Sequence, residues 1–306
     1  MPTLDRITIY PVKSLDGVDV AEARVLPGGA LEHDRRWQLV DMEGRVVNAK
    51  RTPLVHAIRA EFDLGGAGQG SDPGAAANWI HLAVDPAALG ARAIPGVARL
   101  AALAAGSFPL VPGPDGPCGW LSAAFGFDVL LLERPDGGFP DDRDAPGPTL
   151  ISTASLVEVA RWFGFDLDEA RRRFRANLEI GGCDAFWEDA LASPARPELA
   201  PSLLDMDPNE PVDPYADLPP PEPREFTIGE VRFKAMNVCR RCVVPSRDSL
   251  TGAVTEHFRD VFEARRARGL PAAVDASHWG PLYRLAVNTT ANGPGAMATS
   301  ALVAVP

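Results

Sequence analysis

The chain has 306 residues, a length that accommodates two domains with a core each. Its hydrophobic content of 46% and charged content of 23% exclude a disordered protein. Its formal net charge of -11 excludes generic binding to nucleic acid or to an anionic membrane surface, because either polyanion would repel the average protein surface.

Short strands dominate the first part of the predicted fold. Alternating apolar and polar residues predict strands at 6–12, 18–26 and 36–47, the last being a hairpin that turns at Glu43-Gly44. A short helix is expected to end within 122–128, and the apolar residues 129–132 then predict a buried strand. Surface loops are predicted where Gly, Ser, Pro and Asp accumulate, at 65–74 and 112–119.

The second part contains most of the predicted helices. A stretch rich in Pro, Gly and Asp at 135–148 marks the domain boundary, which gives predicted domains at 1–140 and 141–306. Helical spacing predicts helices at 155–163, with Ser152 or Thr153 as N-cap, and at 168–174.

The remaining strands follow these helices. They are expected at 177–180, at 226–235 around a turn at Gly229-Glu230, and at 283–289 and 301–305. The Pro- and acid-rich residues 195–223 are predicted to be a long surface loop. Because strands and helices do not alternate regularly, the sequence indicates a mainly β fold of the α+β class rather than a doubly wound sheet.

The sequence has no recognisable export or membrane signal. No run of about 18 apolar residues occurs, and residues 1–6 lead directly into a strand pattern, so we expect a cytoplasmic protein without a membrane partner. The four cysteines, at 118, 183, 239 and 242, are too few and too scattered for a disulfide framework, and are expected to be free thiols.

Cys239 and Cys242 form a C-x-x-C motif at the end of a predicted strand. A structural zinc site needs four ligands, whereas the other cysteines and the five histidines are dispersed. A thioredoxin-like dithiol opens a helix in a βαβ unit, but Val-Val-Pro follows Cys242. Two buried cysteines that pack as small hydrophobic residues explain the pair equally well when it is taken alone.

The residues around this motif resemble a known family. Residues 239–252, Cys-Arg-Arg-Cys-Val-Val-Pro-Ser-Arg-Asp-Ser-Leu-Thr-Gly, are similar to the signature of the MOSC domain, the C-terminal domain of molybdenum cofactor sulfurases. The resemblance implies that Cys242 is the thiolate that binds molybdenum, as in the amidoxime-reducing members. A soft thiolate suits a metal that the sulfurs of a pterin dithiolene also hold. Asp248 is a candidate catalytic proton donor or orienting group, and alternatively a turn former.

A second segment, residues 174–189, is similar to a strand-turn motif of the family, with Ala176 where a proline is usual. This resemblance implies that Arg175 and Asn177 bind the cofactor. Ser152 and Thr153 stand where the first MOSC helix begins, and they are expected to cap a phosphate.

A third resemblance lies near the start of the chain. Residues 10–15 and 34–37 are similar to the N-terminal β-barrel domain that precedes MOSC in the amidoxime-reducing group. The expected fold is therefore an N-terminal β-barrel-like domain followed by a MOSC β-barrel with a few helices. By position, Lys13, Ser14 and Arg35 are expected to contact the cofactor phosphate and pterin.

An acidic protein that binds an anionic pterin phosphate must gather cations locally. Each basic side chain, taken singly, is explained as well by solvated surface charge. Together, the candidate cations are Lys13, Arg35, Lys50, Arg51, Arg175 and Arg241, with Arg241 also expected to bind the cofactor.

The resemblance implies a molybdenum-dependent oxidoreductase that binds molybdopterin and reduces N-hydroxylated compounds. Relatives with a fused plant-type ferredoxin carry a C-x4-C-x2-C run near the C-terminus, and no cysteine follows Cys242 here. We therefore expect electrons from a separate protein of the ferredoxin, flavodoxin or cytochrome type, and no nucleic-acid partner.

Two alternatives stay open at this point. One is a carrier that transfers sulfur or the cofactor through a Cys242 persulfide, with Cys239 as the resolving thiol. The other is a barrel that has kept the fold and lost the cofactor. Pyridoxal-phosphate chemistry is not expected, because the sequence contains no aminotransferase-like domain.

Overall fold

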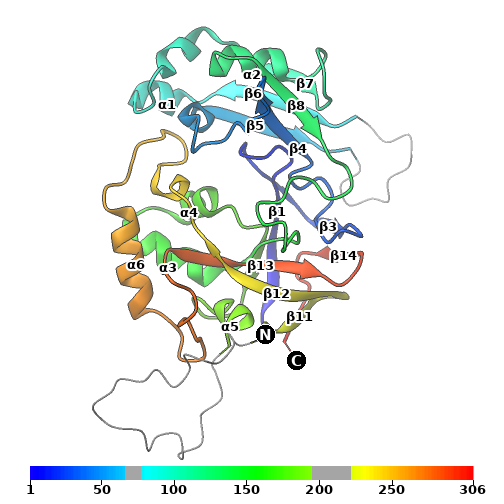
Figure 1. The fold of residues 1–306 in the computed structure, drawn as a ribbon, viewed down its shortest axis with the longest axis vertical. Helices are drawn as coiled ribbons and strands as arrows, with labels where there is room; N and C mark the ends of the chain where they lie inside the picture. The colour runs from blue at the N-terminus through cyan, green and yellow to red at the C-terminus, as the bar shows by residue number, and fades with distance from the viewer. Residues whose placement is uncertain (66–76, 195–221, 306) are drawn as a thin grey trace, which may run out of the picture.

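Strands dominate both halves of the molecule, and most helices lie along one side of its lower half (Figure 1). The computed structural model describes residues 1–65, 77–194 and 222–305. The mainly β prediction with a few helices is confirmed. The loops predicted at 65–74 and 195–223 lie almost entirely outside the described residues.

The largest sheet runs through the lower half. It contains β1 (Thr3–Ile9), β2 (Val18–Val20), β9 (Leu150–Ser152), β10 (Leu178–Gly181), β11 (Glu225–Ile228), β12 (Val231–Arg240), β13 (Arg284–Ala291) and β15 (Val303–Ala304). The order across the sheet is β15-β11-β12-β13-β9-β10-β1-β2, and only β9 and β10 are parallel neighbours. The predicted turn at Gly229-Glu230 joins β11 to β12, which confirms that hairpin.

The other strands form small sheets. The three-stranded sheet has the order β5 (Ile58–Asp63), β6 (Trp79–Val84), β7 (Gly106–Pro109). Two antiparallel pairs complete the fold, β4 (Trp37–Asp41) with β8 (Val129–Glu133) and β3 (Glu22–Val25) with β14 (Gly295–Ala298).

Two strand predictions need correction. The hairpin at 36–47 makes its turn at Gly44, where φ is +76°, but its second arm contributes only an isolated bridge between Val40 and Val46. The regular partner of β4 is β8, far away in the chain. In β8 itself Leu130 and Leu132 are 45% and 40% exposed, so this strand is buried on one face only.

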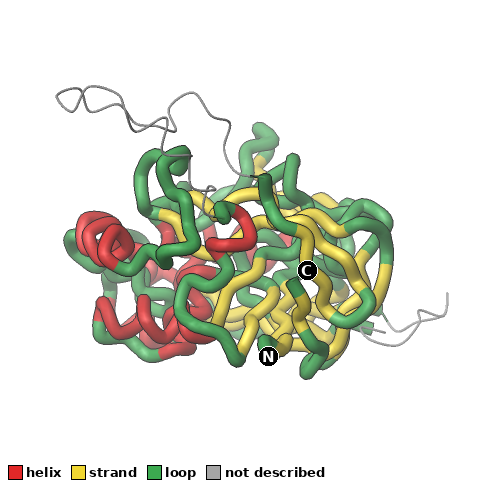
Figure 2. Tube along the Cα trace, turned by 90° about the horizontal axis from the view of Figure 1, so that it is seen from below, coloured by secondary structure: helices red, strands yellow, loops and turns green. Residues whose placement is uncertain are grey.

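Six helices accompany the strands. They are α1 (Pro86–Ala91), α2 (Cys118–Phe125), α3 (Thr153–Phe163), α4 (Leu167–Phe174), α5 (Asp189–Ala192) and α6 (Phe258–Arg268), within the described residues. Helix α2 ends at Phe125, with Gly126 as its C-cap, and α3 and α4 begin within two residues of the predicted positions. Helix α6 was not predicted. Seen from below, the helices gather largely to one side of the strands (Figure 2).

Apolar side chains form separate cores in the two halves. The upper core draws on residues between Val12 and Leu131, whereas the lower core combines Leu4, Ile7 and Ile9 of β1 with strands β9 to β13. The chain thus begins in the lower half, builds the upper half, and returns to the lower half before β9. The division at residue 140 stays a prediction, and the early strands β1 and β3 pair with strands from the second half of the chain.

No helix in the described part of the chain combines the length and the apolar character needed to span a membrane.

Candidate functional site

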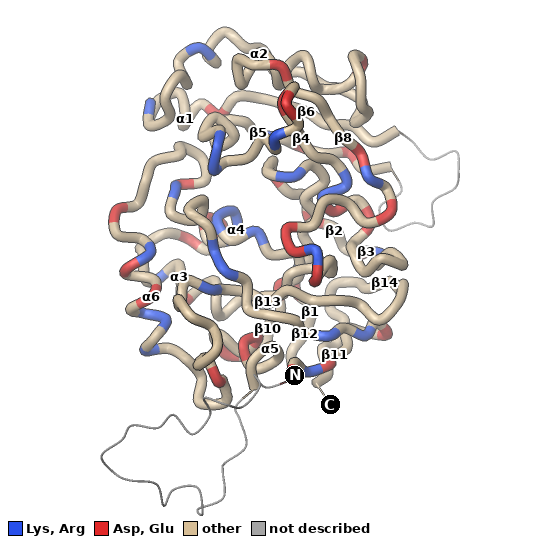
Figure 3. The backbone as a smooth tube through the Cα atoms, viewed as in Figure 1, with Lys and Arg blue, Asp and Glu red and all other residues tan. Residues whose placement is uncertain are grey.

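Residues from both halves line a cavity of about 540 Å³. We call it the cysteine cavity. Its walls are Lys13, Ser14, Arg35, Asn48, Ala49, Lys50, Asp141, Asp142, Arg143, Thr149, Arg173, Phe174, Arg175, Asn237, Cys239, Arg240, Arg241, Cys242, Val244, Pro245, Arg284 and Asn288. Nine of these side chains are cationic and two are carboxylates, in a chain whose net charge is -11. Figure 3 shows Lys and Arg positions around the space between the halves.

Six of the residues singled out in the sequence meet in this cavity, although they come from distant parts of the chain. They are Lys13, Ser14, Arg35, Arg175, Arg241 and Cys242. Lys50 joins them, whereas Arg51 forms an ion pair with Asp41 outside the cavity. Cofactor binding by these residues stays a prediction. It requires them to lie together in one cavity, and they do.

The two cysteines of the C-x-x-C motif have different surroundings. Cys239, the penultimate residue of β12, is 6% exposed, and its thiol donates a hydrogen bond to Oδ1 of Asn288 at 2.7 Å. Burial raises the pKa of the Cys239 thiol to about 11. Cys242 lies beyond the end of the strand and is partly exposed at the cavity wall. Of the two, Cys242 is the thiol that a ligand can reach.

Lys13 and Arg35 share one carboxylate. Nζ of Lys13 lies 2.8 Å from Oδ1 of Asp141, and Nε of Arg35 lies 3.5 Å from Oδ2. Partial desolvation at the cavity wall would raise the pKa of Asp141, but the charges of Arg35 and Lys13 outweigh it and lower this pKa to about 2. The carboxylate is therefore an anion held between two cations.

Two further arginines have unused capacity for an anion. Arg175 donates to the carbonyl of Leu15 at 2.6 Å and lies 4.1 Å from the ring centroid of Tyr10, and no carboxylate in the described part of the chain pairs with it. Burial lowers the pKa of Arg175, with the charge of Arg35 contributing, but a guanidinium keeps its proton at neutral pH. Arg241 donates to backbone carbonyls, while its Nε is buried and, among the described residues, without a partner.

Three cavity residues have left-handed backbones: Ser14 (φ +79°), Arg35 (φ +49°) and Arg175 (φ +53°). Such a conformation costs a residue other than glycine about 1 kcal/mol or more, and it persists where the surrounding structure enforces it. At Arg175 the conformation ends helix α4, with the N–H bonded to the carbonyl of Arg171 at 2.9 Å. Three of the nine described residues other than glycine that have such a backbone therefore line the cavity.

The residues of the predicted phosphate cap at the start of α3 lie outside the cysteine cavity, and their binding of a phosphate stays a prediction. Ser152 is fully buried, and its Oγ accepts the N–H of Ser155 at 3.0 Å, so the hydroxyl caps the helix. Thr153 Oγ1 is also buried and has no partner among the described residues. Neither side chain lines the cysteine cavity.

Asn177 and Asp248 act next to the cavity and do not line it. The Asn177 amide donates to Oδ1 of Asp34 at 2.9 Å, and Asp34 in turn pairs with Arg35. The Asp248 carboxylate accepts the N–H groups of Leu250 and Thr251, which is the turn-forming alternative considered above. Both side chains thus bond to neighbouring protein groups, and their predicted roles in cofactor binding and catalysis stay predictions.

Several cavity residues had no signal in the sequence. Asp141 and Asp142 lie in the Pro- and Gly-rich stretch that marks the predicted domain boundary, and Asn237 and Asn288 lie inside strands. Asn237, Asn288 and Asp142 form a small network, with Nδ2 of Asn237 3.0 Å from Oδ2 of Asp142. The asparagines pair across β12 and β13, which only the sheet register reveals.

The described residues contain no group of three or more His, Cys, Asp or Glu side chains placed to hold a metal ion. A metal bound at Cys242 would therefore need most of its ligands from a cofactor. A pterin dithiolene supplies such ligands.

Comparison with known proteins identifies the start of the chain. Residues 1–87 match the MOSC N-terminal beta barrel domain, which confirms that part of the resemblance. The chain is also similar, over 61% to 85% of its length, to proteins named molybdenum cofactor sulfurase. The protein from Drosophila erecta is 30% identical over 207 residues, 61% of this chain and 24% of its own length. The human protein is 21% identical over 294 residues, 85% of this chain and 28% of its own length.

This chain thus spans about a quarter of the length of the curated relatives that it matches. These relatives are named sulfurases, so the narrower resemblance to amidoxime-reducing proteins stays a prediction. Among solved structures, the YUAD protein from Bacillus subtilis aligns over 99% of this chain and 94% of its own, but its TM-score of 0.34 and 9% identity are too low to inform the function.

Proposed function

We propose that this protein binds a molybdenum-pterin cofactor in the cysteine cavity, with Cys242 as the thiolate on the metal. The observation that carries the proposal is the presence of the accessible Cys242 thiol in one cavity with nine cations. The cations offset the charge of a pterin phosphate in an otherwise acidic protein. The relation to molybdenum cofactor sulfurases supports a function connected with this cofactor.

The residues present fit such a group. A buried, unpartnered Nε on Arg241 and an Arg175 without a carboxylate, both judged among the described residues, leave donors for a phosphate or for the pterin ring. Lys13, Ser14 and Arg35 stand beside them at the wall. When bound, the cofactor would supply two-electron redox chemistry at its metal.

We propose further that the protein reduces N-hydroxylated compounds in the cytoplasm, a reaction for which the bound cofactor would supply the redox chemistry. The reaction breaks an N–O bond: two electrons and two protons convert the N–OH group to N–H and water. The electrons would come from a separate ferredoxin-, flavodoxin- or cytochrome-type protein. The protein's own residues would hold the cofactor, orient the substrate and stabilise anionic groups near the metal.

The test is elemental analysis of the full chain, produced in a host that makes the cofactor, together with reduction of benzamidoxime by chemically reduced viologen. We expect about one molybdenum per chain and loss of both metal and activity in Cys242→Ala. Cys118→Ala is the matched control, because Cys118 lies at the start of α2 outside the cavity and should leave both unchanged. A Cys242→Ala variant that kept molybdenum and activity would refute the proposal.

A second candidate is a sulfur or cofactor carrier that works through a Cys242 persulfide. The names of the relatives favour it. The surroundings of Cys239 weigh against a dithiol version, because a buried thiol with a pKa near 11 is a poor resolving nucleophile. Intact-protein mass spectrometry separates the two functions. A carrier gains about 32 Da from the one added sulfur of a Cys242 persulfide, and it retains no pterin.

A further inference from the structure

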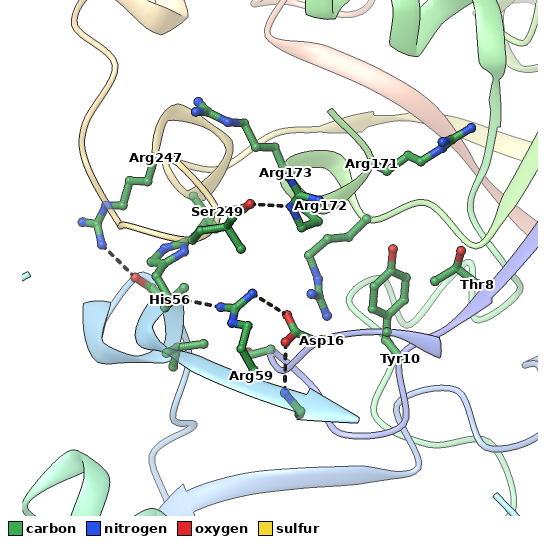
Figure 4. A pocket seen from close by; sticks show the side chains of 18 of the residues that line it. Thr8, Tyr10, Asp16, His56, Arg59, Arg171, Arg172, Arg173, Arg247 and Ser249 are labelled. Carbon is green, nitrogen blue, oxygen red and sulfur yellow. Dashed lines mark hydrogen bonds and ion pairs between the residues drawn. The ribbon is translucent and has the colours of Figure 1, made fainter. Parts of the chain in front are cut away.

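A second cavity, of about 450 Å³, adjoins the cysteine cavity. We call it the arginine cavity, and its characteristic wall residues are Arg59, Arg172, Arg175, Arg247 and His56. The two cavities share Ser14, Ala49, Arg173, Arg175 and Val244, so Arg175 lies at the boundary between them. Figure 4 shows Arg59, Arg172, Arg247 and His56 around the same space, from different elements of the fold.

The arginine cavity has more positive than negative charge. Seven arginines and three carboxylates line it. Some arginines are already neutralised: Arg59 lies 3.3 Å from both Asp16 and Asp85, and Arg172 lies 3.2 Å from Glu169.

Arg175 and Arg247 are not neutralised in this way. Arg247 donates to the carbonyl of Ala49 at 3.0 Å, and within the described ranges neither arginine has a carboxylate partner. Arg175 follows the end of α4, and Arg247 follows a 3-10 helix at Val244–Ser246. Two guanidinium groups from separate elements therefore line one space with their charges uncompensated.

His56 gives an independent indication of a ligand. It lies in the 3-10 helix Pro53–Ala57 and is 8% exposed, yet its Nε2 is buried without a hydrogen-bond partner in the described structure. A buried polar atom without a partner costs about 1 to 3 kcal/mol, so its presence at a cavity wall points to a partner that binds there.

Burial lowers the pKa of His56 to about 4, and the charges of Arg247, Arg59 and Arg175 add to this effect. The ring is therefore neutral at pH 7, with these three cations facing it. A bound anion would counter the effect of the arginines and let the ring accept or share a proton.

We propose that the arginine cavity binds the phosphate group of a small molecule. A phosphate presents several oxygens in different directions, and arginines that approach from separate elements can each bind it through two N–H groups. The phosphate comes from one of two sources: the cofactor itself, if the cofactor extends past Arg175, or a separate phosphorylated molecule placed beside it. The proposal does not depend on molybdenum.

The test is a calorimetric titration of the full chain with inorganic phosphate and with glycerol 3-phosphate, on protein from a host that cannot make the pterin cofactor. We expect binding that Arg247→Gln weakens about tenfold, as expected for loss of a charge-assisted hydrogen bond. His56→Phe should weaken phosphate binding several-fold. This variant tests the same cavity if Arg247→Gln does not fold. Both residues line the arginine cavity and not the cysteine cavity.

Arg259→Gln is the matched control, because this arginine pairs with Glu263 on the exposed face of α6 and should not affect phosphate binding. Absence of phosphate binding in the wild-type chain would overturn the proposal. So would binding that Lys13→Gln weakens and the Arg247 and His56 variants do not, since that phosphate would lie in the cysteine cavity.

Repeating the titration on cofactor-loaded protein identifies the source. If loading abolishes phosphate binding, the phosphate belongs to the cofactor; if binding persists, the site takes a separate molecule. If the protein is found to contain no molybdenum, the proposed function is refuted. The phosphate titration still tests the arginine cavity in that case.

Discussion

The ammonium group of Lys13 lies 2.8 Å from the carboxylate of Asp141, and the second oxygen of that carboxylate lies 3.5 Å from Nε of Arg35. Asp141 thus occupies the position between two cations that we assign to an anionic cofactor group. Its side chain is 69% exposed and can swing away, whereas Lys13 and Arg35 are 19% and 12% exposed and held in place. We infer that Asp141 competes with the cofactor for these cations.

Asp141→Asn should therefore strengthen cofactor retention. An exposed ion pair contributes up to about 1 kcal/mol, so the variant is expected to lose cofactor up to about fivefold more slowly during dialysis. Pterin fluorescence and molybdenum analysis of the retained protein measure the rate. Asp144→Asn is the control, since Asp144 is exposed and forms no ion pair among the described residues. Faster loss from Asp141→Asn would show that the carboxylate helps to hold the cofactor.

The two cysteines of the motif should differ in reactivity. At pH 7.5 iodoacetamide is expected to modify Cys242 at least about tenfold faster than Cys239, because only a thiolate reacts and the Cys239 pKa is raised to about 11 by burial. Modification of Cys239 should rise as the pH approaches 11. Peptide mass spectrometry on the cofactor-free chain gives both rates. Equal rates at pH 7.5 would mean that Cys239 is not buried in solution.

Sequence patterns predicted the positions of strands and helices better than they predicted which strands pair with one another. The alternation at 226–235 predicts the β11–β12 hairpin, because the whole signal is local. The pairing of β4 with β8 joins residues about 90 positions apart, so a local pattern could not distinguish it from a hairpin with 42–47. Helix α6 was missed because six of its eleven residues are arginines or carboxylates, on a short segment with few large apolar residues.

The sequence predicted several cations and the thiol of the candidate site, but it did not predict how the site residues are arranged in space. Lys13, Arg35 and Cys242 stood out by motif, and the fold brings them to one cavity. Ser152 and Asn177 stood out equally, yet both are buried and bonded to the protein itself. A motif identifies polar residues that matter, but burial decides whether they meet a ligand or hold a neighbouring residue.

Asn177→Leu tests this distinction. Asn177 is 2% exposed, donates to Asp34 and to the carbonyl of Thr8, and accepts the N–H of Thr149. Leucine would leave these groups without partners, so we expect a loss of about 2 to 4 kcal/mol in the free energy of unfolding, measured with urea. The exposed Asn292→Leu should change it by less than about 0.5 kcal/mol. Wild-type stability in Asn177→Leu, with weaker cofactor binding, would instead assign Asn177 to the ligand.

A buried acidic pair below α3 predicts how stability depends on pH. Glu188 and Asp189 are fully buried, and Asp189 forms an ion pair with the equally buried Arg266. No described residue hydrogen-bonds the Glu188 carboxylate oxygens. Burial, with the neighbouring charge of Asp189, raises the pKa of Glu188 to about 7 from an ordinary value of 4.5.

Because the pKa of Glu188 is higher in the folded than in the unfolded chain, the folded protein binds the extra proton more tightly. The resulting stability is fully present below about pH 4.5 and is lost as the pH rises to about 7. We expect Glu188→Gln to remove this dependence, so that the variant gains on the order of 2 kcal/mol relative to wild type between pH 5 and pH 8. Urea unfolding of both proteins at the two pH values measures the difference, and comparing them cancels the contributions of all titratable groups that the two proteins share. The exposed Glu256→Gln should follow wild type at both pH values. If Glu188→Gln also followed wild type, the carboxyl group would have to be ionised at pH 5 and stabilised by water or by a shift of Arg266.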